Sequence, residues 1–234
     1  MQIVITDFVA GAQSARGLTV IIDVFRAFSV AAYAFHHGVA RIVPVGPVET
    51  ARALKAQHPD WLLIGERHAR ALPGFDCGNS PTDVSRLDLA GRTLIHTTHS
   101  GTQGLTSAQQ ADEVITGALV NAAAIVGYIR ERQPQLVTLT RMGHEARERC
   151  EEDDLCAEII AARLRGESPD VSDVRPRLRS ASSAAKFFDP VCDWAPLEDF
   201  DRCTEVDRFP FVLRLQRESA MPTLARYDVR TGSE

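Results

Sequence analysis

The 234-residue chain lacks several features that would assign it at once to a class of protein. It has no apolar run close to the roughly 18 residues that a membrane span requires, and its N-terminus has no basic stretch typical of a signal peptide. The net charge of -5 gives no electrostatic support for a nucleic-acid partner. The five cysteines form no CxxC pair, which favours reduced thiols over a disulfide framework. We therefore expect a cytoplasmic protein that binds neither membranes nor nucleic acid.

Two nucleotide-binding motifs are also missing. GxxxxGK[ST], the phosphate-binding loop, does not occur, and neither does GxGxxG, the dinucleotide-binding turn. The sequence contains no internal repeat and no low-complexity block. Any phosphate chemistry must therefore use another kind of site.

Short apolar runs alternate with helical patterns along most of the chain. The strand candidates have the length and β-branched content of buried strands. They are 2–6, 18–23, 41–45, 61–65, 93–97, 113–116 and 136–140, with a last one at 209–216. Helical patterns cover 28–35, 47–57, 119–132 and 151–165, and a connector with a surface helix is expected in 167–183.

This alternation predicts an α/β fold with three layers, α/β/α, and a largely parallel, mixed sheet. We expect one domain over residues 1–234, with no readable boundary between subdomains, and a frayed end at 230–234. The chain is a candidate homo-oligomer.

Polar residues follow several of the predicted strands. In open α/β sheets, ligands bind beyond the carboxyl ends of the strands, where helix N-termini also point. At or just after these ends stand Asp23, Arg26, Glu66, Arg141 and TTHSGT (97–102), and the helix at 151 begins with four acidic residues. We expect these groups to meet at one edge of the sheet.

Each of these features also has an ordinary structural explanation. Asp23 is a candidate cap for the helix that follows it. The acidic run 151–154 is what the dipole at a helix N-terminus favours. TTHSGT is a candidate for a turn in which Ser100 or Thr102 caps a helix over 104–110. The functional interpretation rests on the convergence of all of them.

The expected edge combines two kinds of site. The turn TTHSGT offers hydroxyl and backbone N–H groups at a helix start, which suit a phosphate. These groups belong to Thr97, Thr98, Ser100, Gly101 and Thr102. Hard oxygen ligands suited to Mg²⁺ come from carboxylates, and crowded carboxylates repel one another without a cation. The candidates are Asp23, Glu66, Asp76, Glu152 and Asp153. Together they predict metal-assisted phosphate chemistry.

Four motifs follow one another along the chain: VIIDVFRAFS (20–29), GERHARALPGFDCGNSP (65–81), TTHSGT (97–102) and EDDLCA (152–157). In sequence and in order they resemble the motifs of the 2-phosphosulfolactate phosphatases, the ComB-like family. The resemblance implies an α/β/α fold and Mg²⁺-dependent hydrolysis of 2-phospho-3-sulfolactate to 3-sulfolactate, a step of coenzyme M biosynthesis. Three positions depart from the family pattern: Phe28 replaces a Thr, His99–Ser100 replaces an Asn, and Glu158 replaces a Gly.

The family resemblance and the residues together suggest roles for the candidates. We expect Asp23, Arg26, Glu66 and Asp76 to be catalytic. The metal ligands are predicted to be Glu66, Asp76, Glu152 and Asp153. The substrate, a small anionic phosphate ester, is expected to bind Asn79, Ser80, the residues of the turn and Arg141. Two alternatives stay open: a phosphatase of a different metabolite, and a non-catalytic anion-binding or regulatory protein on the same fold.

Overall fold

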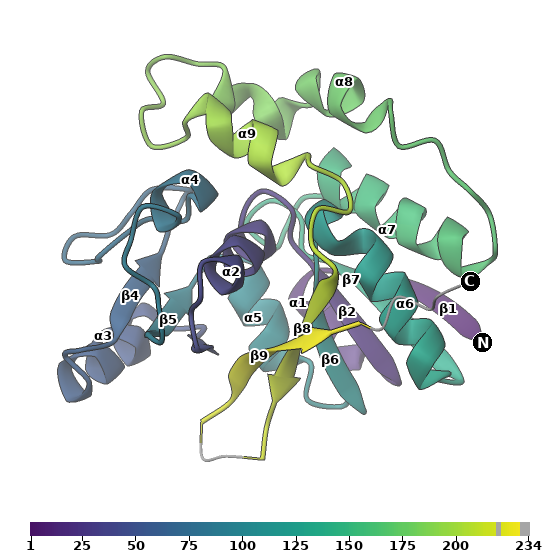
Figure 1. Cartoon of the computed structure of the whole chain (residues 1–234), viewed down its shortest axis with the longest axis horizontal. Helices are drawn as coiled ribbons and strands as arrows, with labels where there is room; N and C mark the ends of the chain where they lie inside the picture. The colour runs from purple at the N-terminus through teal and green to yellow at the C-terminus, as the bar shows by residue number, and fades with distance from the viewer. Residues whose placement is uncertain (219–220, 230–234) are drawn as a thin grey trace.

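A computed structural model describes residues 1–218 and 221–229, so the predicted fraying at 230–234 lies outside the described residues. Within this part the strands form a nine-stranded sheet in the order β1-β7-β2-β6-β8-β9-β3-β5-β4 (Figure 1). The strands are β1 (Gln2–Asp7), β2 (Leu18–Ile22), β3 (Arg41–Pro44), β4 (Leu62–Gly65), β5 (Thr93–Thr97), β6 (Glu113–Gly117), β7 (Leu136–Arg141), β8 (Phe211–Gln216) and β9 (Thr223–Asp228).

The eight predicted strands are all confirmed, with shifts of at most two residues at their ends. The strand β9 was missed. Its sequence, TLARYD, carries two charges, and Leu224 is its one buried residue. A short strand with one buried side chain has no apolar run that sequence reasoning could find.

The sheet contains two parallel sets joined by an antiparallel hairpin. One set is β1, β7, β2 and β6, and the other is β3, β5 and β4. The hairpin of β8 and β9 pairs antiparallel with β6 on one side and β3 on the other, so the two sets run in opposite directions across it. Strand twist of about 20–25° per pair accumulates over the five pairs from β2 to β5 to more than roughly 100°. This twist turns the carboxyl ends of both sets toward one cavity.

The helices confirm the layered prediction. They are α1 (Phe8–Ser14), α2 (Ala27–His36), α3 (Val48–Gln57), α4 (Pro81–Val84), α5 (Gly101–Ser107), α6 (Ala122–Arg132), α7 (Glu151–Leu164), α8 (Val174–Arg179) and α9 (Leu197–Cys203). Two 3₁₀ helices, η1 (Leu119–Asn121) and η2 (Ser182–Phe187), complete the set. The short helices α1 and α9 were not predicted. The helix expected to start at Pro81 after Ser80 is confirmed as α4, and α5 begins three residues before the expected 104.

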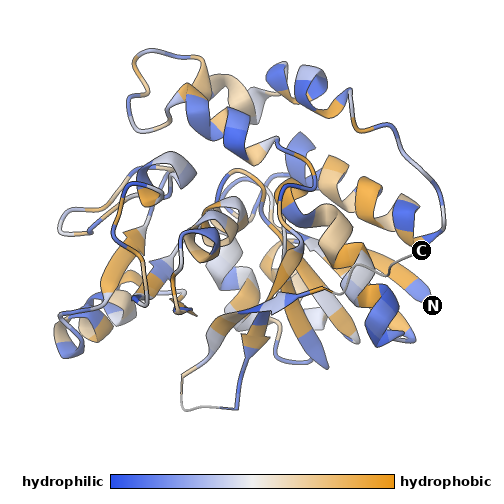
Figure 2. Ribbon diagram, in the orientation of Figure 1, coloured by the Kyte–Doolittle hydropathy of each residue, from blue (hydrophilic) through white to orange (hydrophobic). Residues whose placement is uncertain are grey.

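The two larger of three hydrophobic clusters pack against opposite faces of β2, and the third joins α3 to β3, β4 and β5. On β2, Leu18, Val20 and Ile22 pack with side chains of α6 and α7, while Ile21 packs on the other face with α1, α2 and α5. This alternation follows from the two-residue period of a strand. Figure 2 shows the strands largely in orange, the colour of hydrophobic residues, as expected for a sheet covered on both faces.

The segment after α7 covers the edge where the site forms. In Figure 1, α8 and α9 lie above α2, α4 and α7, and α9 contacts α4 and η2. Within the described residues, no helix combines the length and the apolar character needed to cross a bilayer.

Candidate active site

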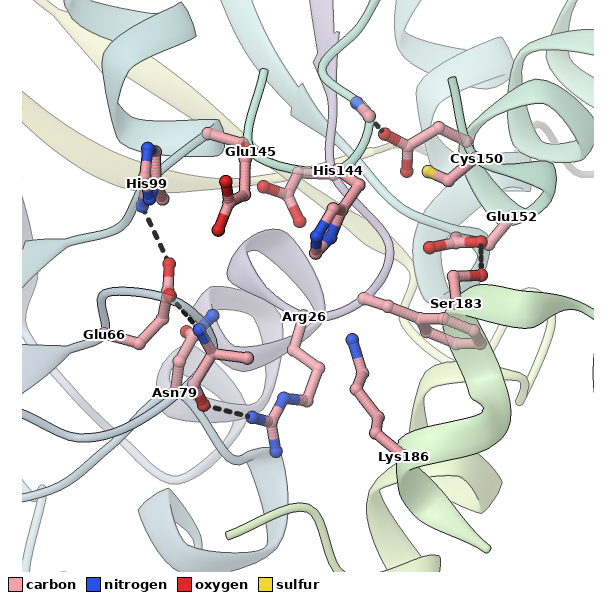
Figure 3. A pocket seen from close by; sticks show the side chains of 16 residues that line it. Arg26, Glu66, Asn79, His99, His144, Glu145, Cys150, Glu152, Ser183 and Lys186 are labelled. Atoms are coloured by element: carbon pink, nitrogen blue, oxygen red, sulfur yellow. Dashed lines mark hydrogen bonds between the residues drawn. The ribbon is translucent and has the colours of Figure 1, made fainter. Parts of the chain in front are cut away.

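A small polar cavity lies beyond the carboxyl ends of β2, β4, β5 and β7. Its volume is about 50 Å³, several times the roughly 10–15 Å³ that one water needs. Figure 3 shows the side chains around it. The lining residues are Asp23, Phe25, Arg26, Glu66, Ala69, Asn79, His99, Ser100, Gly143, His144, Glu145, Cys150, Glu152, Asp153, Ser183 and Lys186.

Asp23 and Asp153 are held rigidly by backbone groups. Asp153 Oδ1 accepts a hydrogen bond from the Val24 N–H at 2.8 Å, and its Oδ2 accepts one from the Gly143 N–H at 2.8 Å. Asp23 Oδ1 accepts from the Ala27 N–H at 3.1 Å. Both side chains are buried, so their carboxylates are fixed in orientation as well as in place.

Glu66 is fixed in the same way by the loop that follows β4. Its Oε1 accepts from the His99 N–H and its Oε2 from the Ala69 N–H, both at 2.7 Å. The loop needs glycine at its start, because Gly65 has φ +143° and a Cβ there would lie 1.9 Å from the Thr97 carbonyl oxygen. This explains why Gly65 and Glu66 stand together at the end of β4. The glycine lets the backbone pass close to β5, and the next residue places its carboxylate in the cavity.

The buried carboxylates strongly perturb each other's ionisation. Burial raises the pKa of Asp23 to about 7, and the nearby Glu66 adds to the rise, although the Ala27 and Gly101 N–H groups oppose it. Burial also raises the pKa of Asp153 well above its usual range, with further contributions from Asp23 and Glu152. Such shifts mark a cavity with more negative charge than its cations balance.

Arg26 lines the cavity, but its guanidinium is largely engaged elsewhere. Nη1 donates to Asp199 Oδ2 and to the Trp194 carbonyl oxygen, and Nη2 donates to the Ala69 carbonyl oxygen. Asp199 also accepts from the Ser80 hydroxyl at 2.8 Å. Arg26 and Ser80 thus belong to a buried network that connects α9 to the β2 and β4 loops.

Lys186 is the cation that is left for a ligand. Its ammonium group lies over the rings of Phe187 and Phe25, 5.1 and 5.9 Å from their centroids. Across residues 1–218 and 221–229 it has no hydrogen-bond partner, and Figure 3 shows it pointing into the cavity. Its pKa is lowered chiefly by burial and then by Arg26, while Glu152 and Asp23 act in the opposite direction. An oxyanion in the cavity would give this ammonium the hydrogen-bond acceptor it lacks.

Half of the predicted site residues line the cavity. They are Asp23, Arg26, Glu66, Asn79, Ser100, Glu152 and Asp153. Seven others do not line it. They are Asp76, Ser80, Thr97, Thr98, Gly101, Thr102 and Arg141.

The prediction that Asp76 joins the other carboxylates is wrong. Its Oδ2 accepts from the Leu63 N–H at 2.7 Å and forms an ion pair with Lys55 at 3.0 Å. The loop from β4 returns along that strand, and the Asp76 N–H donates to the Leu63 carbonyl oxygen. Asp76 therefore fastens the loop to β4 from the outside, although it stands only ten residues after Glu66.

Arg141, which was expected to bind the substrate, does not line the cavity. Its guanidinium binds both oxygens of Asp7, at 2.8 and 3.1 Å, and pairs with Asp154 at 3.0 Å. Asp7 ends β1 and Asp154 lies on α7, so Arg141 ties two elements to the end of β7.

The turn TTHSGT binds carboxylates of the protein instead of forming the expected phosphate cradle. The Thr98 N–H donates to Thr102 Oγ1 at 2.8 Å, and the Thr102 N–H donates to Thr98 Oγ1 at 3.1 Å. The His99 N–H is bound by Glu66, and the Gly101 N–H by Asp23. These N–H groups already have acceptors, so the turn orients the carboxylates of the cavity. The expected capping role falls to the hydroxyl of Thr98 and not to that of Ser100.

Gly101 is needed where α5 meets α2. A Cβ there would lie 2.8 Å from both the Ala27 Cβ and the Asp23 Oδ2. The neighbouring Phe28, one of the departures from the family pattern, is fully buried in the core. Glu158 is exposed on α7, whereas His99 and Ser100 line the cavity. Of the three departures, only the one in the turn changes the lining.

Several lining residues carried no signal in the sequence. Ser183 ends the segment expected to be a connector, and Lys186 follows it in a stretch for which no element was predicted. Cys150, His144 and Glu145 lie in the loop between β7 and α7. Charge balance was the one available signal for Lys186. A site with several buried carboxylates can bind an anionic substrate only if a cation lies beside it, so a lysine or arginine near the site was to be expected.

Comparison with known proteins finds the family that the sequence motifs resemble. The family model for 2-phosphosulpholactate phosphatase matches residues 5–218. A probable 2-phosphosulfolactate phosphatase of Bacillus subtilis is 28% identical over 210 residues, which cover 89% of this chain and 91% of the relative. One from Caldanaerobacter subterraneus is 31% identical over 211 residues, covering 84% and 87% of the two chains.

The fold, the carboxylate cavity and these matches define the protein as a phosphoric monoester hydrolase. The chain belongs to the 2-phosphosulfolactate phosphatase family.

Proposed function

We propose that the protein is a Mg²⁺-dependent phosphatase that hydrolyses 2-phospho-3-sulfolactate to 3-sulfolactate and phosphate. The observation that carries the proposal is the set of four buried carboxylates (Asp23, Glu66, Glu152 and Asp153) around one small cavity, with Lys186 as a cation that no described residue holds by a hydrogen bond. The substrate is the one named for the family and for the relatives in Bacillus subtilis and Caldanaerobacter subterraneus.

The donor set fits Mg²⁺. Asp23 and Asp153 are hard oxygen donors fixed by backbone N–H groups, and a carboxylate oxygen that accepts one hydrogen bond keeps a lone pair for a cation. Glu66 and Glu152 line the same cavity and would bind the ion directly or through water. A bound divalent cation would neutralise the repulsion that raises the pKa of Asp23 and Asp153. It would supply polarisation of the phosphoryl oxygens and a water of lowered pKa.

The protein's own residues would hold the substrate. Lys186 would bind a phosphate or sulfonate oxygen as a charge-assisted donor. Asn79 lines the cavity, and its side chain is oriented by the buried His96 at 3.1 Å. Ser183 donates to Glu152 and keeps its hydroxyl oxygen at the cavity wall. The buried carboxylate side of the cavity has a lower effective dielectric constant than water, which would strengthen each of these interactions.

The proposal is tested by phosphate release from purified protein after treatment with EDTA and after return of Mg²⁺. The panel of esters should include 2-phospho-3-sulfolactate, 2-phospholactate, 2-phosphoglycerate and 3-phosphoglycerate. It is chosen because His99 and Ser100 line the cavity where the family pattern has Asn. We expect turnover of the sulfolactate ester that is lost with EDTA and restored by Mg²⁺. Release of phosphate that EDTA does not affect would refute the metal requirement, and faster turnover of another ester would reassign the substrate.

A matched pair of variants locates the metal. Glu152→Gln removes a charge from the cavity but keeps a partner for Ser183, whereas Asp76→Asn removes a charge outside the cavity. We expect the first to lose most Mg²⁺-dependent activity and the second to keep it. The opposite pattern would place the metal at the loop and not in the cavity.

A further inference from the structure

Two histidines and a glutamate lie together at the rim of the candidate active site. One nitrogen of each imidazole, of His68 and of His99, and one carboxylate oxygen of Glu145 all lie within 4.8 Å of one another. His68 Nδ1 is 2.6 Å from Glu145 Oε1, and the two imidazole ring centroids are 5.2 Å apart. The three residues come from the β4–α4 loop, the β5–α5 turn and the β7–α7 loop, so the fold and not local sequence brings them together.

The environment of His99 points to a missing ligand. Its Nδ1 is buried and has no hydrogen-bond partner among the described residues. A buried ring nitrogen without a partner is unfavourable, and native structures nearly always satisfy such atoms. The backbone N–H of His99 donates to Glu66, which fixes the position of the His99 backbone and so the origin of its side chain.

The chemistry of this cluster differs from that of the carboxylate cavity. Asp23, Glu66, Glu152 and Asp153 are oxygen donors, which suit Mg²⁺. Two imidazoles and one carboxylate instead suit a borderline transition-metal ion such as Zn²⁺, which takes ligand bonds of about 2.0–2.2 Å and often keeps a position open. Tetrahedral bonds of that length place the donor atoms roughly 3.4 Å apart. The His68 side chain is 73% exposed and free to make the small adjustment this needs.

We propose that His68, His99 and Glu145 form a second metal site, selective for a Zn²⁺-like transition-metal ion, at the mouth of the cavity. His99 and Glu145 also line the cavity, so an ion held there would offer its open position to an anionic group of a bound ligand. It would also clamp three loops that the bond between His68 and Glu145, the ring contact between His68 and His99, and the Glu66 hydrogen bonds already bring together. The site does not depend on the Mg²⁺ assignment.

Cobalt(II) is a suitable probe because its visible absorption is weak with six oxygen ligands and stronger with imidazole ligands at lower coordination number. The full-length protein would be titrated with Co²⁺ in the presence of excess Mg²⁺, which occupies the carboxylate site. We expect one strongly absorbing Co²⁺ per chain, displaced by Zn²⁺. His99→Asn and Glu145→Gln should each weaken its binding at least tenfold.

Controls separate this site from the alternatives. His37→Asn alters an exposed pair of adjacent histidines, His36 and His37, and should leave the Co²⁺ spectrum unchanged. Glu152→Gln should reduce Mg²⁺-dependent phosphate release while keeping the Co²⁺ signal, so the two proposals can fail independently. Circular dichroism and melting temperature would show that each variant folds.

Three outcomes would overturn the proposal. One is wild-type protein that gives no strong visible band at millimolar Co²⁺. Another is unchanged binding in both His99→Asn and Glu145→Gln. The third is a thiolate-to-cobalt charge-transfer band that disappears on removal of Cys150, because this would place the ion at the thiol that also lines the cavity.

Discussion

The buried histidine behind Asn79 gives a quantitative prediction about stability and pH. His96 lies on β5 with 1% of its surface exposed, and its Nε2 lies 3.1 Å from Asn79 Oδ1. Burial lowers the pKa of His96 to about 4. The folded protein therefore keeps this imidazole neutral, with the proton on Nε2, at pH values where the unfolded chain has already protonated it.

The sign of the effect follows from linkage. A histidine whose folded pKa is below its unfolded value contributes stability that is present above pH 6.5 and lost as the pH falls toward 4. The difference between the two pKa values corresponds to roughly 3 kcal/mol in full. Between pH 7.5 and pH 5 the same relation gives a loss of about 2 kcal/mol from His96.

Other groups in the cavity act in the opposite direction. Asp23 and Asp153 have raised pKa values in the folded protein. Their contribution to stability is present at low pH and is lost as the pH rises through their folded pKa values, about 7 for Asp23. The pH dependence of the wild type is thus a sum of opposing terms. A variant at position 96 isolates the histidine.

His96→Gln keeps an N–H donor near the position of Nε2 and removes the titration. Guanidinium unfolding of metal-free protein, followed by the fluorescence of Trp61 and Trp194, would be measured for both proteins at pH 7.5 and pH 5. We expect the wild type to lose about 2 kcal/mol more than the variant on acidification. Equal losses in the two proteins would refute the argument that a neutral His96 is buried behind Asn79.

Three further variants test the cavity and the turn. Glu152→Gln should raise the melting temperature of the metal-free protein by roughly 2–4 °C, because about 1 kcal/mol of carboxylate repulsion is relieved. The same variant should gain less stability from added Mg²⁺ than the wild type does. A thermal scan that shows neither change would contradict the argument that carboxylate repulsion destabilises the empty cavity. Lys186→Met should raise the KM and the inhibition constant for phosphate about tenfold or more, since a charge-assisted hydrogen bond is lost; unchanged inhibition would mean that phosphate binds elsewhere. Thr98→Val should lower stability by about 1 kcal/mol through loss of the hydrogen bond from the Thr102 N–H, and phosphate inhibition measured on folded variant should stay as in the wild type.

The strands and most long helices could be predicted from the sequence because their signals are local. A run such as LTVII on β2 is apolar on both faces, which identifies a strand covered on both sides. Asp23, Glu66, Glu152 and Asp153 could be predicted as neighbours because each stands at a strand end or a helix start, where parallel topology gathers polar groups.

Tertiary structure alone decided which polar groups became the site. Asp76 follows Glu66 by ten residues, yet the loop turns back along β4 and gives that carboxylate to Lys55. Lys186 enters the cavity from a segment without regular pattern, because η2 packs over the edge of the sheet. The hydrogen-bonding groups of TTHSGT could bind a phosphate or a carboxylate equally well by their chemistry. Packing places the carboxylates of Asp23 and Glu66 within hydrogen-bonding distance of the N–H groups of the turn. Such contacts join segments that are far apart in the chain, so no local sequence pattern predicts them.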